Sequence, residues 1–474
     1  MAKPRGTTSE LIRLANAQTF CNNGRVVSDV VAQHASMLLA FRAENVRSFR
    51  DEMELSMLAT SRAEEHVVRE VRWREGGHPL KVLPVAGVFG ANASGKSNVL
   101  RALNDMQWYV LSSFQRSPTG GLHRSPFRLD PDAKQRPSRY EIDLVLNDVR
   151  YEYGFSLDDE RVLEEWAYHY PHGRAKLLFS RSLDGVEVGS VERAQTRAIT
   201  RLMRPNALFL STAALANHPL LLSLYDWFKR NILLAESGNR GVRQAITARA
   251  LETEALRNPI MALLHAADLG ITDARTHELD AATQERRERA RRILMGEEDE
   301  QANGEGDEPP TLEALDISLV HRGADGDVEL EVEEESLGTL VWFGLLAPVV
   351  FALSKGTVFM ADELDASLHP ALVVQLIKLF QDPQTNPHRA QLIFNSHDTT
   401  MLGDSSDDRL LGRDQTWFTE KRSDGSTRLY PLIDLDPRKN EAIGRRYLDG
   451  RYGATPILSR HEFDRVGELI SSGD

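Results

Sequence analysis

The segment Gly90–Ser97 (GANASGKS) has the residue types and spacing of a phosphate-binding loop, G-x-x-x-x-G-K-[ST]. Gly90 and Gly95 let backbone N–H groups close around phosphates without a Cβ in the way. Lys96 is placed to reach the β- and γ-phosphates of a nucleotide, and the Ser97 hydroxyl is placed to ligate Mg²⁺. The pattern predicts a nucleotide site here, and a chance glycine-rich turn is the alternative.

Two adjacent carboxylates end the apolar run Thr357–Glu363 (TVFMADE). A buried strand of this kind places Asp362 at its carboxyl end, where ligands bind in open α/β sheets. We expect Asp362 to hold Mg²⁺ and Glu363 to orient and deprotonate the attacking water. An exposed acidic loop after a strand is the competing interpretation.

Two further motifs flank these carboxylates. Ser336-Leu-Gly338 opens the apolar stretch Leu340–Leu353, and a serine and backbone N–H groups at a helix start can bind phosphate. The alternative is an ordinary N-cap by Ser336. His397 ends a second apolar run, so it could face the γ-phosphate, although a lone histidine is often structural.

The elements expected around these motifs alternate between strands and helices. A strand at 82–89 precedes the phosphate loop, and a helix to about residue 113 follows it. Helical periodicity runs over Leu220–Leu234 and Val242–Leu264, and a basic helix is expected at Gln284–Leu294 before an acidic loop at Glu297–Pro310. The remaining expected strands lie at 37–55, 140–155, 164–170, 175–180, 315–320, 328–332, 357–362 and 391–396.

This order predicts an α/β fold with mixed sheets interrupted by a helical insertion. We expect an N-terminal extension at 1–36, flexible and without the features of a signal peptide. The head would comprise residues 37–213 and 311–474, and the helical insertion with its acidic loop would span 214–310.

Composition limits the remaining classes. The 474 residues carry a net charge of −13, so nucleic acid could bind only at a local basic patch. The single cysteine excludes a disulfide framework and fits a cytoplasmic protein. The apolar run at 340–353 is shorter than the roughly 20 residues of a membrane span, so no membrane association is expected.

Together these motifs resemble the ABC/SMC ATPase head, a P-loop NTPase, in their order along the chain. Asn92, Asn98 and the opening FRAENVRSFRDEMEL are similar to the SMC/RecF branch, and 365–370 (DASLHP) to its D-loop. The resemblance implies ATP and Mg²⁺ as cofactors, and catalysis by Glu363, His397 and Lys96. The implied ATP contacts are Gly90, Asn92, Ser94, Gly95, Lys96, Ser97 and Asn98, with Ser336 and Gly338 serving the ATP of a second subunit.

The chain departs from ABC transporters at Leu337 and Thr339, where those proteins have glycine and glutamine. This difference puts the affinity and geometry of a contact in trans in question. For the glutamine loop the candidates are Gln115 and the segment Pro126–Arg128.

A closer resemblance is to the RloA/AbiL-type ATPases of bacterial phage-defence loci. It rests on the segments at 266–271 (AADLGI), 395–398 (NSHD), 413–417 (RDQTW) and 446–454 (RYLDGRYGA). It implies a homo-oligomeric ATPase switch that controls a separately encoded nuclease or toxin. The alternative is a DNA-repair ATPase of the RecF/SMC kind. A transporter motor fits the insertion poorly, and no guanine-reading Asn-Lys-x-Asp motif is present.

Overall fold

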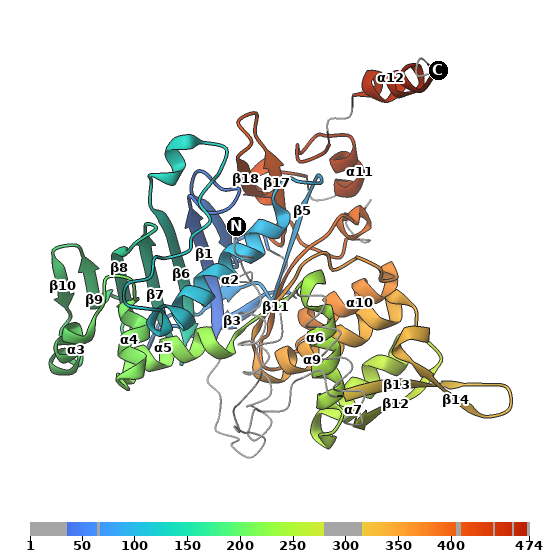
Figure 1. The fold of residues 1–474 in the computed structure, drawn as a ribbon, viewed down its shortest axis with the longest axis horizontal. Helices are drawn as coiled ribbons and strands as arrows, with labels where there is room; N and C mark the ends of the chain where they lie inside the picture. Colours follow the sequence, from blue (N-terminus) through green and yellow to red (C-terminus); the bar gives the residue numbers. More distant parts are fainter. Residues whose placement is uncertain are drawn as a thin grey trace, which may run out of the picture.

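The computed structural model describes residues 36–63, 67–278, 315–403, 409–438, 441–456 and 459–471 (Figure 1). The expectations for residues 1–35, for the basic helix at 284–294 and for the acidic loop at 297–310 lie outside these ranges.

The N-terminal part of the fold is an antiparallel sheet in the order β10-β9-β8-β7-β6-β1-β2. The strand expected at 140–155 is a hairpin of two strands, and Asn147 and Asp148 have the positive φ angles expected of the tight turn between β6 and β7. Its strands are β1 (Met37–Glu44), β2 (Met53–Ser56), β6 (Ser138–Leu146), β7 (Val149–Leu157), β8 (Val162–His169), β9 (Lys176–Ser182) and β10 (Gly185–Val188).

A second sheet carries the phosphate loop, in the order β11-β15-β16-β5-β17-β18. Its first five strands run parallel, so their carboxyl ends meet at one edge, and β18 is antiparallel to β17. The strands are β5 (Val85–Gly90), β11 (Ile232–Ala235), β15 (Val358–Ala361), β16 (Gln391–Asn395), β17 (Thr416–Lys421) and β18 (Thr427–Pro431).

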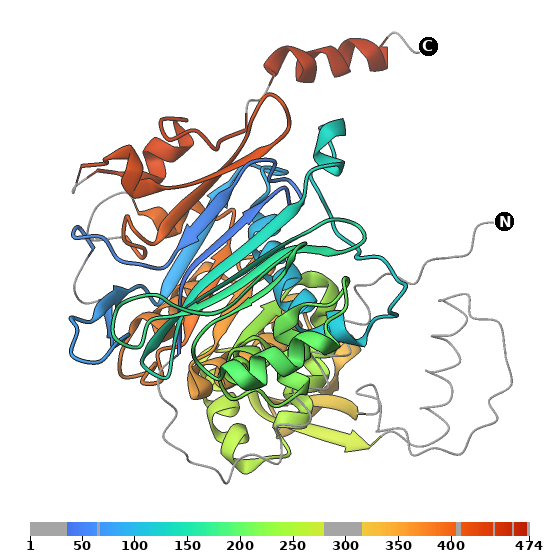
Figure 2. The same ribbon diagram turned by 90° about the vertical axis from the view of Figure 1, so that its left-hand side faces the viewer.

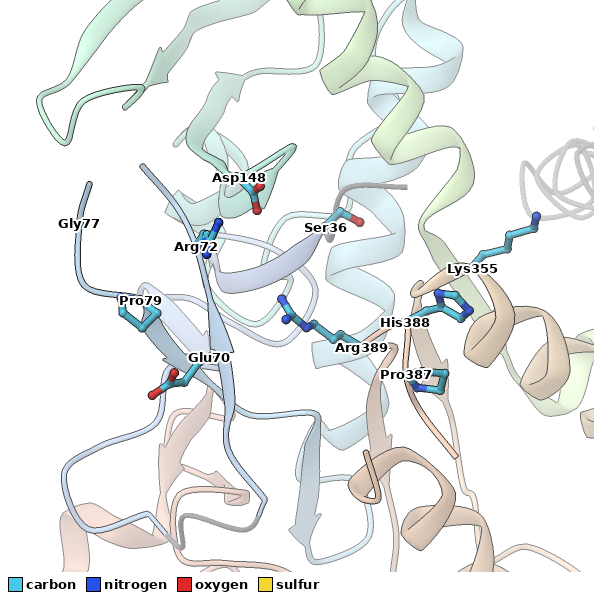
Figure 3. Close-up of a pocket in the computed structure, with 10 residues that line it drawn as sticks. All are labelled: Ser36, Glu70, Arg72, Gly77, Pro79, Asp148, Lys355, Pro387, His388 and Arg389. Atoms are coloured by element: carbon cyan, nitrogen blue, oxygen red, sulfur yellow. The ribbon is translucent and has the colours of Figure 1, made fainter. Parts of the chain in front are cut away.

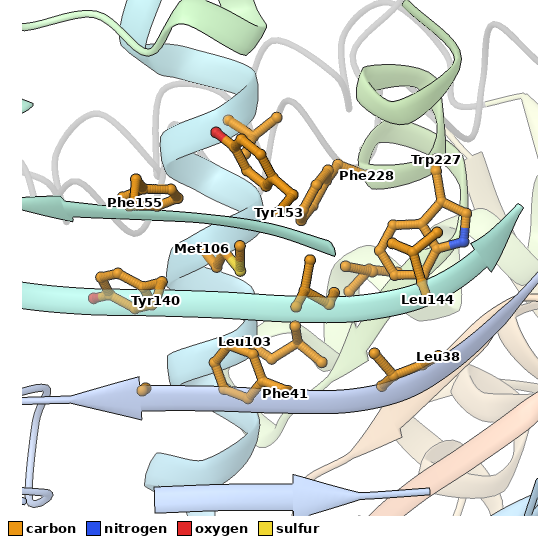
Figure 4. Close-up of a cluster of buried hydrophobic side chains, with 14 of the residues drawn as sticks. Leu38, Phe41, Leu103, Met106, Tyr140, Leu144, Tyr153, Phe155, Trp227 and Phe228 are labelled. Carbon is orange, nitrogen blue, oxygen red and sulfur yellow. The ribbon is translucent and has the colours of Figure 1, made fainter. Parts of the chain in front are cut away.

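Helix α2 (Lys96–Ser112) packs between the two large sheets. Leu103 and Met106 on α2 meet Phe41 of β1 and Tyr140 of β6 in one buried cluster (Figure 4). Helix α2 also contacts β5, β11 and β16 of the second sheet. This burial on both sides fixes the helix that begins at the phosphate loop.

Helices cover the other face of the second sheet. Helix α9 (Leu337–Lys355) contacts β11 and β15, and α6 (Arg240–Ala250) and α7 (Glu254–Ala266) pack on α9. By length and composition α9 could cross a membrane, but most of it is buried in this core, as a core helix requires. Helix α10 (Pro370–Gln381) completes the layer.

The remaining elements surround this core. α12 stands apart from the body of the fold (Figure 1 and Figure 2). The other helices are α3 (Arg193–Ile199), α4 (Phe209–Leu215), α5 (Pro219–Arg230), α11 (Ile443–Leu448) and α12 (Arg460–Ser471), and the other strands are β3 (Arg69–Val71), β4 (Leu80–Val82), β12 (Ile271–Glu278), β13 (Leu315–Arg322) and β14 (Asp327–Glu331).

The predicted helix over Leu220–Leu234 is wrong at its end. Ile232–Ala235 form β11, which pairs with β15 at the edge of the phosphate-loop sheet. The short apolar run continues the spacing of the helix before it, and periodicity cannot separate a helix from a strand over four residues. The region expected to be a helical insertion therefore contributes a strand to the head.

Candidate functional site: the edge of the phosphate-loop sheet

The phosphate loop joins β5 to α2, as its sequence predicts. Gly90 has φ 156°, and a Cβ there would lie 2.5 Å from the backbone oxygen of Thr419. Gly95 has φ 105° and begins α2 without any side-chain cap. The first turn of α2 contains no acidic residue, so its backbone N–H groups and the helix dipole are left for an anion.

Lys96 lies buried in the centre of the loop, 6% exposed. Its Nζ donates to the carbonyl oxygens of Gly90 (2.9 Å) and Ala91 (3.1 Å). Burial lowers the pKa of Lys96 to about 8, although the carboxylates of Asp365, Glu363 and Asp362 act to raise it. A polyphosphate bound against Lys96 would favour its charged form.

Asn395, at the end of β16, joins the two residues expected to hold Mg²⁺. Its Nδ2 lies 2.5 Å from Asp362 Oδ1 and 3.5 Å from Ser97 Oγ. A hydroxyl and a carboxylate are hard oxygen ligands, and Mg²⁺ takes one or two such protein groups and completes its shell with phosphate and water. The donor set therefore fits the metal expected with ATP.

Arg101 occupies the other oxygen of Asp362. Its Nη2 lies 3.2 Å from Asp362 Oδ2, and its Nε lies 3.4 Å from Glu236 Oε2. Glu236 directly follows β11, whose Ala235 is paired with Ala361 of β15, so the two carboxylates lie side by side at the sheet edge. Arg101 is thus the counter-cation of this pair.

Glu363 follows Asp362 in a left-handed conformation with φ 54°. Its backbone N–H donates to Asn395 Oδ1 at 2.6 Å, and its side chain is exposed at the open edge of the site. A non-glycine residue held at positive φ costs on the order of 1 kcal/mol or more and is found mainly where the surroundings fix it. The left-handed conformation directs the chain at Glu363 away from the line of β15.

His397 reaches the phosphate loop from the end of β16. Its Nδ1 lies 3.3 Å from Lys96 Nζ, and its backbone N–H donates to Asp365 Oδ2 at 3.3 Å. Because an ammonium can only donate, a charged Lys96 uses Nδ1 of His397 as an acceptor in this contact. The structure thus brings His397 to the site, as expected of a residue that contacts the γ-phosphate.

Ser336 and Gly338 lie at the start of α9, and Gly338 lies against Ser367 of the 365–370 segment. The Ser336 Oγ accepts from the Thr339 N–H at 3.1 Å, so the alternative N-cap role exists. A Cβ on Gly338 would lie 2.7 Å from the Ser367 carbonyl oxygen, which requires glycine there. Leu337 between them is 49% exposed, which leaves an apolar side chain at the helix start open to solvent.

The family comparison covers most of this site. The model of the family described as "AAA domain, putative AbiEii toxin, Type IV TA system" matches residues 85–403, more than half of the chain. The chain belongs to this family. The matched region includes the phosphate loop, α9, the Asp362-Glu363 pair and His397, and it stops before the 446–454 motif. No curated protein sequence matches the chain.

Several solved structures of SMC heads are similar in shape to this AAA domain. The SMC head domain from Thermotoga maritima is 13% identical with a TM-score of 0.37, over 83% of this chain and 98% of that one. An Smc head bound to the C-terminal domain of ScpA from Pyrococcus furiosus is 13% identical with a TM-score of 0.37, over 85% and 98%. An SmcHead bound to the C-winged helix domain of ScpA is 13% identical with a TM-score of 0.38, over 84% and 99%.

Three residues expected to contact ATP have other surroundings in the AAA domain. The Ser94 side chain is buried and shares a hydrogen bond with Thr419 Oγ1 at 2.7 Å. Asn98 Nδ2 donates to Ser48 Oγ at 2.8 Å, which ties α2 to the turn after β1. Asn92 is exposed at the loop tip. Ser94 and Asn98 therefore position the loop through their side chains, and contacts to ATP would come from their backbone.

The structure does not bring the glutamine-loop candidate Gln115 to the phosphate loop. Gln115 ends a short turn that follows α2, at the end of this helix opposite to Lys96. The Asp434-x-Asp436 pair lies in a turn after β18, and Asp436 pairs with Arg62.

A pocket of about 810 Å³ lies at the opposite edge of the sheet (Figure 3). Lys355 lines it just before β15, and Arg389 lines it just before β16. Both residues precede the strands whose far ends carry Asp362 and Asn395, so this pocket is separate from the phosphate site.

Sequence reasoning missed three residues of the site: Asn395, Arg101 and Glu236. Asn395 was noted only as part of a shared motif, although a polar residue at a strand end beside His397 was a usable signal. Arg101 stands one helical turn after Ser97, a spacing that puts both on one face of α2. Glu236 could not be predicted as a site residue, because β11 places it there and the sequence pattern did not predict β11.

Proposed function

We propose that this chain is an ATP-hydrolysing switch whose site is the cluster around Lys96. The observation that carries the proposal is that Ser97, Asp362, Asn395 and Lys96 meet at one sheet edge, against an uncapped helix N-terminus. These residues come from three separate segments of the chain, so their meeting does not follow from the phosphate loop alone.

Each residue has a distinct task in this proposal. Lys96 gives up its carbonyl partners and binds the β- and γ-phosphates, while Ser97 and Asp362 hold Mg²⁺. Bound Mg²⁺ supplies charge neutralisation at the phosphates. Glu363 orients the attacking water and accepts its proton, and His397 donates a hydrogen bond from its ring to the γ-phosphate.

We propose further that two chains pair face to face, in a dimer or a larger homo-oligomer. The start of α9 in one chain would complete the ATP site of the other, with Ser336 donating its hydroxyl hydrogen. The exposed Leu337 supports this role, because an apolar side chain beside a polar helix start suits a surface that becomes covered.

The description of the family, a putative toxin of a type IV toxin–antitoxin system, supports a role in bacterial defence. The similarity of the segments at 395–398 and 446–454 to phage-defence ATPases points the same way. We place the chain as the ATPase or sensor that controls a separately encoded nuclease or toxin. The alternative of a DNA-repair ATPase rests on Asn98, on the opening segment and on the basic helix expected at 284–294, and that helix lies outside the described residues.

Substitution of Lys96 tests the nucleotide site itself. Lys96→Ala removes the charge-assisted bonds to phosphate, worth about 1.5–3 kcal/mol, so the Kd for ATP with Mg²⁺ should rise about 10- to 100-fold. Binding is measured by calorimetry or with a fluorescent ATP analogue. Lys355→Ala is the matched control, because Lys355 lies at the opposite edge of the sheet and should leave the Kd unchanged. Equal Kd values for wild type and Lys96→Ala would show that this site does not bind the nucleotide.

A further inference from the structure

The C-terminal segment Glu441–Ala454, here called the brace, ends on the phosphate loop. The backbone N–H of Ala91, the second residue of the loop, donates to the carbonyl oxygen of Ala454 at 2.7 Å. The carbonyl oxygen of Ala91 accepts from Lys96 Nζ at 3.1 Å. One residue of the loop is therefore held by the brace through its N–H and by the phosphate-binding lysine through its carbonyl.

The Ala454 carbonyl is aimed at the loop by a strained backbone. Ala454 has φ 59°, in the left-handed region that alanine rarely adopts, and it is 4% exposed. Tyr447 Oη donates to the same carbonyl oxygen at 3.1 Å. Such a conformation costs about 1–2 kcal/mol and persists only where neighbouring contacts fix it.

Aromatic stacking fastens the brace to the sheet. The Phe418 ring on β17 stacks on Tyr447, with centroids 5.2 Å apart and planes 7° apart, and on Tyr452 at 6.0 Å and 17°. Phe418 is paired with Phe89 of β5, the strand that leads into the phosphate loop. Tyr430 Oη adds a hydrogen bond to the Tyr452 carbonyl at 2.6 Å. The brace therefore packs on β17, and β17 pairs with β5, the strand that leads into the phosphate loop.

A buried carboxylate holds the other end of the brace. Glu441 is 8% exposed and accepts hydrogen bonds from Tyr452 Oη (2.6 Å), Arg446 Nη1 (2.5 Å) and the Arg438 N–H (2.9 Å). A buried carboxylate is stable only when it is paired in this way. The bonds join the start of the brace to its last turn, so the brace forms one closed unit beside β17 and β18 (Figure 1).

We infer that the brace positions the phosphate loop for nucleotide binding through the Ala454 carbonyl. Ala454 and Tyr447 are positioning residues, since Ala454 holds Ala91 and Tyr447 holds the Ala454 carbonyl. The inference rests on the proposed function, and it gives the 446–454 motif a physical role. Because coupling is reciprocal, nucleotide in the loop must also stabilise the brace.

The first test uses two opposite substitutions in the full chain. Ala454→Val disfavours the left-handed backbone and displaces the carbonyl, so the Kd for a fluorescent ATP analogue should rise about tenfold. Ala454→Gly keeps the carbonyl and removes the strain, so its Kd should stay within about twofold of wild type. Leu448→Ala, on an exposed side chain of α11, is the control and should change nothing. Equal affinities of Ala454→Val and Ala454→Gly would overturn the inference.

The second test needs no substitution. Hydrogen exchange of the wild-type chain is measured by mass spectrometry with and without ATP and Mg²⁺, and nucleotide should slow exchange in peptides covering 86–98 and 446–456 together. Slower exchange in the 86–98 peptides alone would overturn the role inferred for the brace and would leave the proposed function in place. Protection of neither segment would count against the nucleotide site itself.

Discussion

At the scale of single residues, the charge balance around Asp362 decides how the site responds to metal. Asp362 has one oxygen on Asn395 and the other on Arg101, and Arg101 also contacts Glu236. A cation that ligates Asp362 must share that carboxylate with a guanidinium already present. Glu236 offers the guanidinium an alternative partner, which provides a path for the exchange.

Removal of Arg101 should therefore make Mg²⁺ easier to bind. Because the Arg101 side chain is 39% exposed, water screens the ion pair, and we expect the Mg²⁺ concentration for half-maximal nucleotide binding to fall no more than about fivefold in Arg101→Ala. A Mg²⁺ titration with a fluorescent ATP analogue measures this, with Arg101→Lys as the charge-preserving control. A higher Mg²⁺ requirement in Arg101→Ala would show instead that the arginine helps to bind phosphate.

Glu363 provides a sharper test of the reaction. Glu363→Gln keeps the size of the side chain and the backbone bond to Asn395, but an amide cannot accept the proton of water. Turnover should fall by about 10²–10⁴-fold while ATP still binds. Phosphate release and nucleotide Kd are measured on the same preparation. Turnover at the wild-type rate would remove Glu363 from its role as general base.

At the scale of elements, the brace should show a defined pH response. Burial alone would raise the pKa of Glu441, but the bonds from Tyr452 and Arg438 and the charge of Arg446 lower it below its usual 4.5. A carboxylate with a lowered pKa contributes stability above its unfolded pKa and loses it as the pH falls through the folded pKa.

Glu441→Gln should consequently lower Tm at pH 7, and the gap to wild type should narrow as the pH falls below about 4.5. Thermal unfolding across this pH range measures the gap. A gap that stays constant with pH would mean that shape, and not charge, makes Glu441 important to the brace.

The elements also show how much of the fold can be predicted from the sequence. The phosphate loop, β15, β16 and α9 were predictable because each has a strong local signal: a motif, a buried apolar run or a strand-end polar residue. β11 was not, because its four apolar residues continue the pattern of the preceding helix. The contacts of Asn395 and of Ala454 depend on the order of strands in the sheet, and strand order is a property of the tertiary fold that one sequence does not display.

At the scale of the whole molecule, the site is open on the side where Glu363 and Asn92 are exposed. The start of α9, with exposed Leu337, is the surface we propose to cover the ATP of a second copy. Pairing would then depend on bound ATP and would be lost on hydrolysis. Nucleotide binding and assembly are linked in this way.

The most direct measurement is the solution mass of Glu363→Gln with and without ATP and Mg²⁺, by light scattering on a sizing column. The account predicts that the mass rises to two or more chains only with ATP. It also predicts that adding Ser336→Asp, which keeps the α9 cap but repels phosphate, prevents this rise while each separate chain still binds ATP. A mass that is the same with and without ATP, in a protein shown to bind ATP, would contradict the account.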